Sequence, residues 1–129
     1  PRGLGPTIAP VAALLAGSNV VPIEKLTFSA LGEPGFVQAV RRLGLRDVVV
    51  VGMETHICVF QTVRDLRALG YGVHVPFDGV ASRRDDHREV GLDLCRGVGA
   101  SVTTAETVAF DWLRRAGTDA FKAVSKLVR

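Results

Sequence analysis

Residues 48–62 (VVVVGMETHICVFQT) combine a nucleophilic side chain with a local pattern that could activate it. The unbroken run Val48–Val51 predicts a fully buried strand, which Gly52 ends. Cys58 then stands at the expected start of a helix, where unsatisfied N–H groups and the helix dipole favour the thiolate. The alternative is a buried, inert thiol, because free cysteines are among the most buried residue types. The pattern makes Cys58 a candidate nucleophile.

A catalytic thiolate also needs a cation or base and an oxyanion site. Lys25, in the segment EKLTFSA, follows the apolar run Val20–Ile23, which predicts a short strand. Its small and apolar neighbours indicate a partly enclosed position, although a solvated charge at a strand end is the common alternative. A lysine close to Cys58 would favour the thiolate. Backbone N–H groups of residues 52–58 could receive an oxyanion.

The other polar residues make weaker candidates. His56, His74 and His87 are isolated, and none has a second ligand at metal-binding spacing. His56 could act as a base beside the thiol, but the start of a helix would turn it elsewhere. Asp78 could orient a site residue or form a turn, and Asp85–Asp86 suit a helix N-terminus. We therefore expect neither a metal nor another cofactor from these residues.

The composition indicates a single globular domain. The chain has 129 residues, of which 47% are hydrophobic and 22% charged, and no apolar run is long enough to span a bilayer. Arginine pairs are scattered and lack interleaved aromatics, so no nucleic-acid partner is expected. Cys58 and Cys95 lie on separate predicted helices and form no CxxC pair, which favours a reducing, cytoplasmic location.

Strand and helix patterns alternate along the chain. Strands are predicted over Val20–Ile23, Val48–Val51, Val73–Phe77 and Ala100–Thr103, and helices over Pro34–Leu43, His56–Leu69, Asp85–Arg96, Glu106–Arg115 and Asp119–Val128. Such alternation predicts a three-layer, doubly wound α/β fold, with a parallel sheet between helices on both faces. Sites in this class lie at the carboxyl ends of the strands. The segment from Gly52 to Cys58 follows such an end.

The segment GMETHICVFQT resembles the nucleophile motif of the isochorismatase-like cysteine hydrolases, which include nicotinamidases and N-carbamoyl-amino-acid amidases. The likeness is closest to the small isochorismatase domain-containing subgroup. It continues through GLGPT, EKLTFSA, DGVASRRDDH, GASVTTAETVAFDWL and FKAVSKLV. The resemblance implies a doubly wound, Rossmann-like α/β fold. It also implies hydrolysis of a small amide, or of an isochorismate-like vinyl ether, through cysteine catalysis with an acyl-enzyme intermediate.

The resemblance assigns roles to particular residues. Cys58 matches the nucleophile and Lys25 the lysine of an Asp–Lys–Cys triad. Met53–Glu54 matches a non-proline cis peptide, after which the N–H groups of Glu54 and Cys58 would form the oxyanion hole. Phe28 and Thr55 are candidate substrate contacts.

One member of the implied triad has no match. The family's aspartate precedes the segment that GLGPT matches, and no acid in Pro1–Glu24 follows an apolar strand. We therefore expect residues 1–129 to form one hydrolase domain that lacks its first two strands and general base. The flank of Val48–Val51 would then be exposed, and the isolated chain would be poorly soluble or partly unfolded. Metal ligands of nicotinamidase-type relatives lie in the same missing part.

The resemblance also implies partners. A small-molecule substrate is expected, and relatives form dimers and larger rings, so a homo-oligomer is expected too. Phe110, Trp112 and Leu113 would suit a subunit contact, or would pack in the core. The alternative function is a catalytically inactive homologue that serves as an oligomeric interaction module. No membrane partner is expected.

Overall fold

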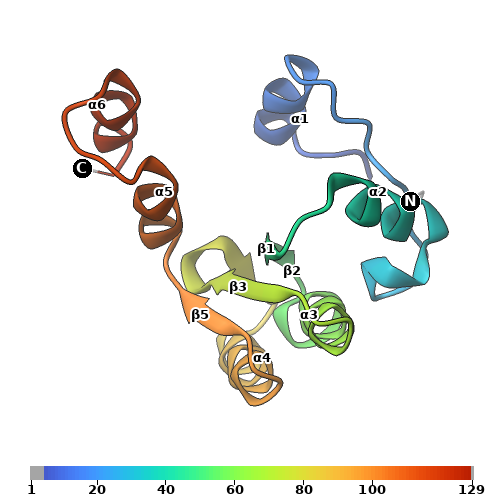
Figure 1. Ribbon diagram of the computed structural model, residues 1–129. Coiled ribbons are helices and arrows are strands. Elements are labelled where there is room, and N and C mark those ends of the chain that lie inside the picture. The colour runs from blue at the N-terminus through green and yellow to red at the C-terminus, as the bar shows by residue number, and fades with distance from the viewer. Residues whose placement is uncertain (1–4, 129) are drawn as a thin grey trace.

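Parallel strand pairing organises the chain. The computed structural model describes residues 5–128, so Gly3 and Leu4 of the GLGPT segment lie outside the described residues. A three-stranded parallel sheet has the order β1-β3-β5, and a parallel pair joins β2 to β4 (Figure 1). The strands are β1 (Asp47–Val49), β2 (Gly52–Met53), β3 (Gly72–Pro76), β4 (Val80–Ala81) and β5 (Ser101–Thr103).

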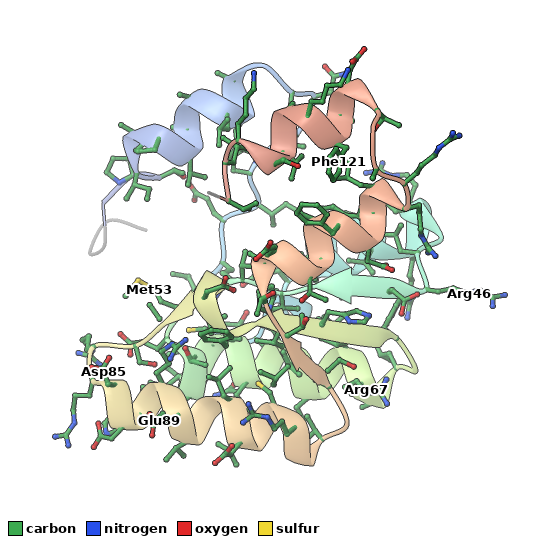
Figure 2. All side chains as sticks on the ribbon, turned by 90° about the vertical axis from the view of Figure 1, so that its left-hand side faces the viewer. Arg46, Met53, Arg67, Asp85, Glu89 and Phe121 are labelled. Atoms are coloured by element: carbon green, nitrogen blue, oxygen red, sulfur yellow. The ribbon has the colours of Figure 1, made fainter. Side chains whose placement is uncertain are left out.

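A helix lies along the chain between the two members of each parallel strand pair, as expected for an α/β protein. They are α1 (Ala9–Ala16), α2 (Pro34–Leu43), α3 (Phe60–Ala68), α4 (Asp85–Gly97), α5 (Ala105–Leu113) and α6 (Asp119–Ser125). Shorter turns are η1 (Ala30–Gly32), the π-helical η2 (Thr55–Val59) and η3 (Phe77–Gly79). Helices α3 and α4 lie on one side of the sheet, and α5 and α6 lie beyond the other (Figure 2). No helix within residues 5–128 is long and apolar enough to cross a membrane.

The core lies between the sheet and helices α3 and α4. In β3, Val73 and Val75 are buried while His74 between them is partly exposed, which is the period of two expected of a strand. The buried apolar cluster comprises Val59, Val63, Leu66, Val73, Val75, Val80, Leu92, Cys95 and Ala100. Helices α5 and α6 contribute no buried residue and contact each other edge to face through Phe110 and Phe121. Trp112 is exposed.

The prediction of a fully buried strand over Val48–Val51 was wrong. Strand β1 ends at Val49, its valines are half-buried, and Val51 is 59% exposed. In the described part of the chain β1 pairs only with β3. An edge strand has no neighbour to cover its second flank, so a valine run alone does not bury it.

The strand predicted over Val20–Ile23 is absent from the described residues. This segment is irregular, and Val21 is 82% exposed. Pro22 offers no N–H to a sheet ladder, and no described strand pairs with the segment. Helix α1, which was not predicted, begins just before Pro10, and a proline in the first turn is a common helix-start signal.

The helix predicted over His56–Leu69 exists in two parts. Residues Thr55–Val59 form the π-helical turn, and α3 continues from Phe60 to Ala68. The predicted helix Pro34–Leu43 is confirmed, with Gly44 in the left-handed conformation at its C-terminus (φ 61°).

Helix α4 packs directly on the π-helical turn through Gly91. A Cβ atom built on Gly91 would lie 2.6 Å from the backbone nitrogen of His56 and 2.7 Å from the carbonyl carbon of Thr55. Backbone atoms cannot yield as a flexible side chain can. The absence of a side chain at Gly91 therefore allows α4 to approach the turn this closely.

Substituting this glycine should separate the two elements. We expect Gly91→Ala to lower the free energy of unfolding by about 1–3 kcal/mol, because added volume at a packed contact forces the backbone apart. Gly97→Ala, in the same helix with open space around the added Cβ, should be neutral or stabilising by roughly 0.4–1 kcal/mol. Urea unfolding of both variants measures the difference, and equal midpoints would contradict the close approach.

Candidate active site

Cys58 lies in the π-helical turn that follows β2. The carbonyl oxygen of Glu54 accepts hydrogen bonds from the N–H groups of Ile57 at 3.1 Å and Val59 at 3.2 Å. The second bond spans five residues, which defines a π turn, a feature often found at functional sites. Thr55 and Val59 are buried, whereas Cys58 between them is partly exposed. The peptide bond between Met53 and Glu54 is cis.

The turn is fixed by the segment that follows β4. The Thr55 hydroxyl donates to the Ala81 carbonyl at 2.8 Å, and the Thr55 N–H donates to Ser82 Oγ at 3.1 Å. His56 Nδ1 also lies 3.1 Å from Ser82 Oγ. A single serine hydroxyl therefore contacts two consecutive residues at the start of the turn.

The Glu54 side chain is engaged by the same segment. Its carboxylate accepts the Arg83 N–H at 3.1 Å and lies 3.2 Å from Arg83 Nε. Any contribution of Glu54 to chemistry at Cys58 would therefore come from its backbone N–H. The family resemblance assigns this N–H group to the oxyanion hole.

Lys25 is in a loop, not at the end of a strand as predicted. Its Nζ donates to the carbonyl oxygens of Thr27 at 2.9 Å and Phe28 at 3.0 Å. An ammonium group has three N–H donors, so one more can serve a further acceptor. These two bonds curl the side chain back over its own loop.

Glu33 holds this loop together. Its Oε1 accepts hydrogen bonds from the Leu26 N–H at 3.1 Å, the Thr27 N–H at 3.4 Å and the Thr27 hydroxyl at 3.0 Å. These hydrogen bonds lower the pKa of the Glu33 carboxyl below its ordinary value, and the bond from the Leu26 N–H has the largest effect. The carboxylate form of Glu33 thus stabilises the loop that carries Lys25.

Lys25 and Cys58 line the same clefts. A cleft of about 340 Å³ is bounded by both residues, Met53 and the valines of Val48–Val51. A second of about 660 Å³ shares Lys25, Met53 and Cys58 and adds Phe28 and other mostly apolar residues. Met53 lies at the end of the sheet (Figure 2). The fold therefore places the predicted nucleophile and the predicted lysine on the same two largely apolar clefts.

Other predicted residues lie elsewhere. The Thr55 side chain is fully buried, donates its hydroxyl to the Ala81 carbonyl and lines neither cleft. His56 and His87 contact each other, with ring centroids 4.6 Å apart. Asp78 accepts the N–H of Ala105 at 2.8 Å and so fixes the start of α5. No cluster of metal-ligating side chains occurs within residues 5–128.

The two thiols differ in environment. Cys95 is fully buried in the core, and burial raises its pKa to about 11. Cys58 is partly exposed on the clefts, and neither cysteine is in a disulfide. Only Cys58 is placed to react with a molecule from solution.

Three positions that sequence reasoning did not select shape the site. Glu33 holds the lysine loop, Ser82 holds the cysteine turn, and the buried Thr62 contacts both elements. Their hydrogen bonds join residues 7, 27 and 32 positions apart, respectively. No local spacing marks such contacts, although Ser82 and Thr62 both stand in segments that carry the resemblance.

Comparison with known proteins identifies relatives over nearly the whole chain. The isochorismatase domain matches residues 3–107. Isochorismatase domain-containing protein 2 of Bos taurus is 36% identical over 130 aligned residues, which cover 100% of this chain and 61% of that protein.

Solved structures show the same fold. The MAR1 ribonuclease of Caenorhabditis elegans superimposes with a TM-score of 0.90 and 32% identity over 99% of this chain and 65% of that one. A nicotinamidase from Staphylococcus aureus superimposes with a TM-score of 0.69 and 29% identity over 75% of this chain and 63% of that one. The chain thus spans less than two thirds of the length of each of these relatives.

The contrast between the thiols predicts selective alkylation. In the folded protein at pH 8, iodoacetamide should modify Cys58 at least about tenfold faster than Cys95, because Cys95 is buried and stays protonated. Peptide mass spectrometry locates the label, and alkylation in denaturant, which should modify both residues, is the control. Equal rates in the folded protein would contradict the buried environment of Cys95.

The Glu33 hydrogen bonds predict a pH dependence of the lysine loop. Because the pKa of Glu33 is lowered from its ordinary 4.5, its carboxylate stabilises the loop above that pH. This stabilisation is lost as the pH falls through the lowered value. The NMR amide signals of Leu26 and Thr27 should titrate together, with a midpoint below 4.5. Glu33→Gln should abolish that titration and Glu106→Gln should preserve it, whereas a midpoint at or above 4.5 would refute the assignment.

Proposed function

Because the chain belongs to the isochorismatase family, we propose that it carries the nucleophile and the lysine of a cysteine hydrolase acting on small amides. The observation that carries the proposal is the position of Cys58 and Lys25 on shared clefts. The turn bearing Cys58 is fixed by neighbouring backbone and side chains, as a preorganised site requires.

In the proposed reaction the Cys58 thiolate attacks the amide carbonyl carbon. A C–S bond forms while the carbonyl electrons move to oxygen, where the N–H groups of Glu54 and Cys58 receive the negative charge. Each such donor contributes about 3 kcal/mol in known enzymes. The C–N bond then breaks, and the amine leaves with the proton that the general base removed from the Cys58 thiol. Water attacks the resulting thioester, releasing the carboxylic acid and restoring the thiol.

Lys25 provides the positive charge that favours the thiolate. Two of its N–H groups are held by the carbonyls of Thr27 and Phe28, which orient the ammonium without neutralising it. A fixed cation costs little reorganisation when the thiolate forms. The general base would be the aspartate that the family resemblance places before the GLGPT match.

The cleft lining favours a small, partly apolar substrate. Phe28, Leu26, Ile23 and Met53 line the larger cleft beside Cys58. The relative from Staphylococcus aureus is named a nicotinamidase, which makes a primary carboxamide the first candidate. The relative from Caenorhabditis elegans is named a ribonuclease. RNA is less well matched by an apolar cleft, because phosphate recognition uses clustered cations.

The proposal predicts that activity of the intact protein depends on one thiol. With nicotinamide as substrate and ammonia release as the measurement, Cys58→Ser should lose a thousandfold or more of turnover, roughly the scale of nucleophile removal in other hydrolases. Lys25→Met, which removes the charge but keeps an unbranched side chain, should lose about a hundredfold. Cys95→Ala is the matched control and should retain the rate.

Two outcomes would decide against the proposal. If Cys58→Ser keeps the wild-type rate of ammonia release, cysteine catalysis is excluded. If Cys58→Ser also cleaves RNA at the wild-type rate, the activity named for the Caenorhabditis elegans relative is favoured. If Cys58 of the folded protein reacts with iodoacetamide no faster than a free thiol does, the alternative function, a non-catalytic interaction module, is favoured.

A further inference from the structure

One buried hydroxyl joins the lysine loop to the cysteine turn. Thr62 Oγ1 accepts a hydrogen bond from the Ala30 N–H at 3.0 Å and donates one to the carbonyl oxygen of Cys58 at 2.8 Å. A threonine hydroxyl has one proton and two lone pairs, so it can make both bonds at once. Thr62 is 7% exposed and lines the smaller cleft between the two elements.

Few other hydrogen bonds connect the lysine loop to the rest of the molecule. Within the described residues, the hydrogen bonds of segment 24–33 connect partners inside 24–37, except the bond from Ala30 to Thr62. The loop is thus internally braced but is tied by hydrogen bonding to the core of the molecule at one point. That point is also bonded to the backbone of the nucleophile.

We propose that Thr62 is a positioning residue that sets the distance between Lys25 and Cys58. This inference rests on the proposed function, because it assumes that the Lys25 charge promotes the Cys58 thiolate. Thr62 acts through the two elements it bonds and touches no reacting atom. Without the Thr62 hydroxyl, the lysine loop keeps its internal hydrogen bonds but is no longer held in position against the cysteine turn.

Substitutions at Thr62 can separate the effect of the hydroxyl group from the effect of side-chain volume. Thr62→Val keeps the volume and branching but offers no hydrogen bond, leaving the Ala30 N–H and the Cys58 carbonyl without this partner. Thr62→Ser keeps the hydroxyl and loses only a methyl group. Thr104→Val is a control background, because it also removes a threonine hydroxyl that accepts a backbone N–H, that of Thr107. It does so at the start of α5, outside both the lysine loop and the cysteine turn.

The test measures how strongly Lys25 promotes Cys58 in each background. The rate of iodoacetamide modification of Cys58 is measured from pH 5.5 to 9, with and without Lys25→Met. Wild type, Thr62→Val, Thr62→Ser and Thr104→Val serve as backgrounds, and thermal unfolding confirms that each variant is folded.

The expected result is a loss of coupling confined to one background. Lys25→Met should slow the reaction at pH 6 by about tenfold in wild type, Thr62→Ser and Thr104→Val, the size expected from removing a nearby charge. In Thr62→Val the same substitution should change the rate by less than about twofold, because the lysine is no longer held near the thiol. A general loss of stability would not produce this difference between matched threonine variants.

Two results would overturn the inference, and they differ. If Lys25→Met slows Cys58 modification by the full tenfold in the Thr62→Val background, the positioning role is overturned and the proposed function still stands. A Lys25 effect absent from wild type would overturn the lysine's proposed role in the function and the inference with it.

Discussion

Parallel pairing of β2 with β4 places two chain segments side by side at the point where their strands end. In register, Gly52 pairs with Val80 and Met53 with Ala81. The residues that follow must then meet, and they do so through the Ser82 and Arg83 contacts with the start of the turn. The position of Cys58 follows from this constraint, because the π turn begins at Thr55, two residues after the last residue that the pairing holds. Helix α4 can close over the turn only where Gly91 leaves room.

The sequence allowed the α/β class and most helices to be predicted, because these depend on local periodicity and on end signals such as Pro34 and Gly44. It also singled out Cys58 and Lys25, through strand-end reasoning and then through the family resemblance. The structure places both residues on shared clefts, although Lys25 is held by loop carbonyls and not by a strand. The valine run over-predicted burial because burial depends on a neighbouring strand, which a single segment cannot specify.

The remainder of the site could not be predicted from spacing. Ser82 and Thr62 are ordinary polar residues whose importance comes from partners 27 and 32 residues away. The π turn likewise depends on how the carbonyl of Glu54 is shared between Ile57 and Val59. The bonds of Ser82 and Thr62 are tertiary contacts, whereas the π turn is a local feature in a segment whose sequence pattern predicts the first turn of an ordinary helix. Only the three-dimensional arrangement distinguishes them from other serines, threonines and helix starts.

The uncovered flank of β1 has a consequence for the size of the clefts. The valines of Val48–Val51 form one wall of the smaller cleft, and the backbone of β1 is paired on one side in the described residues. Unpaired N–H and C=O groups along a strand edge are a template for another strand. A strand added there would lie about 4.8 Å away, the spacing of a β-sheet, and would narrow the cavity beside Cys58. The occupancy of that strand edge would therefore set the width of the cleft beside Cys58.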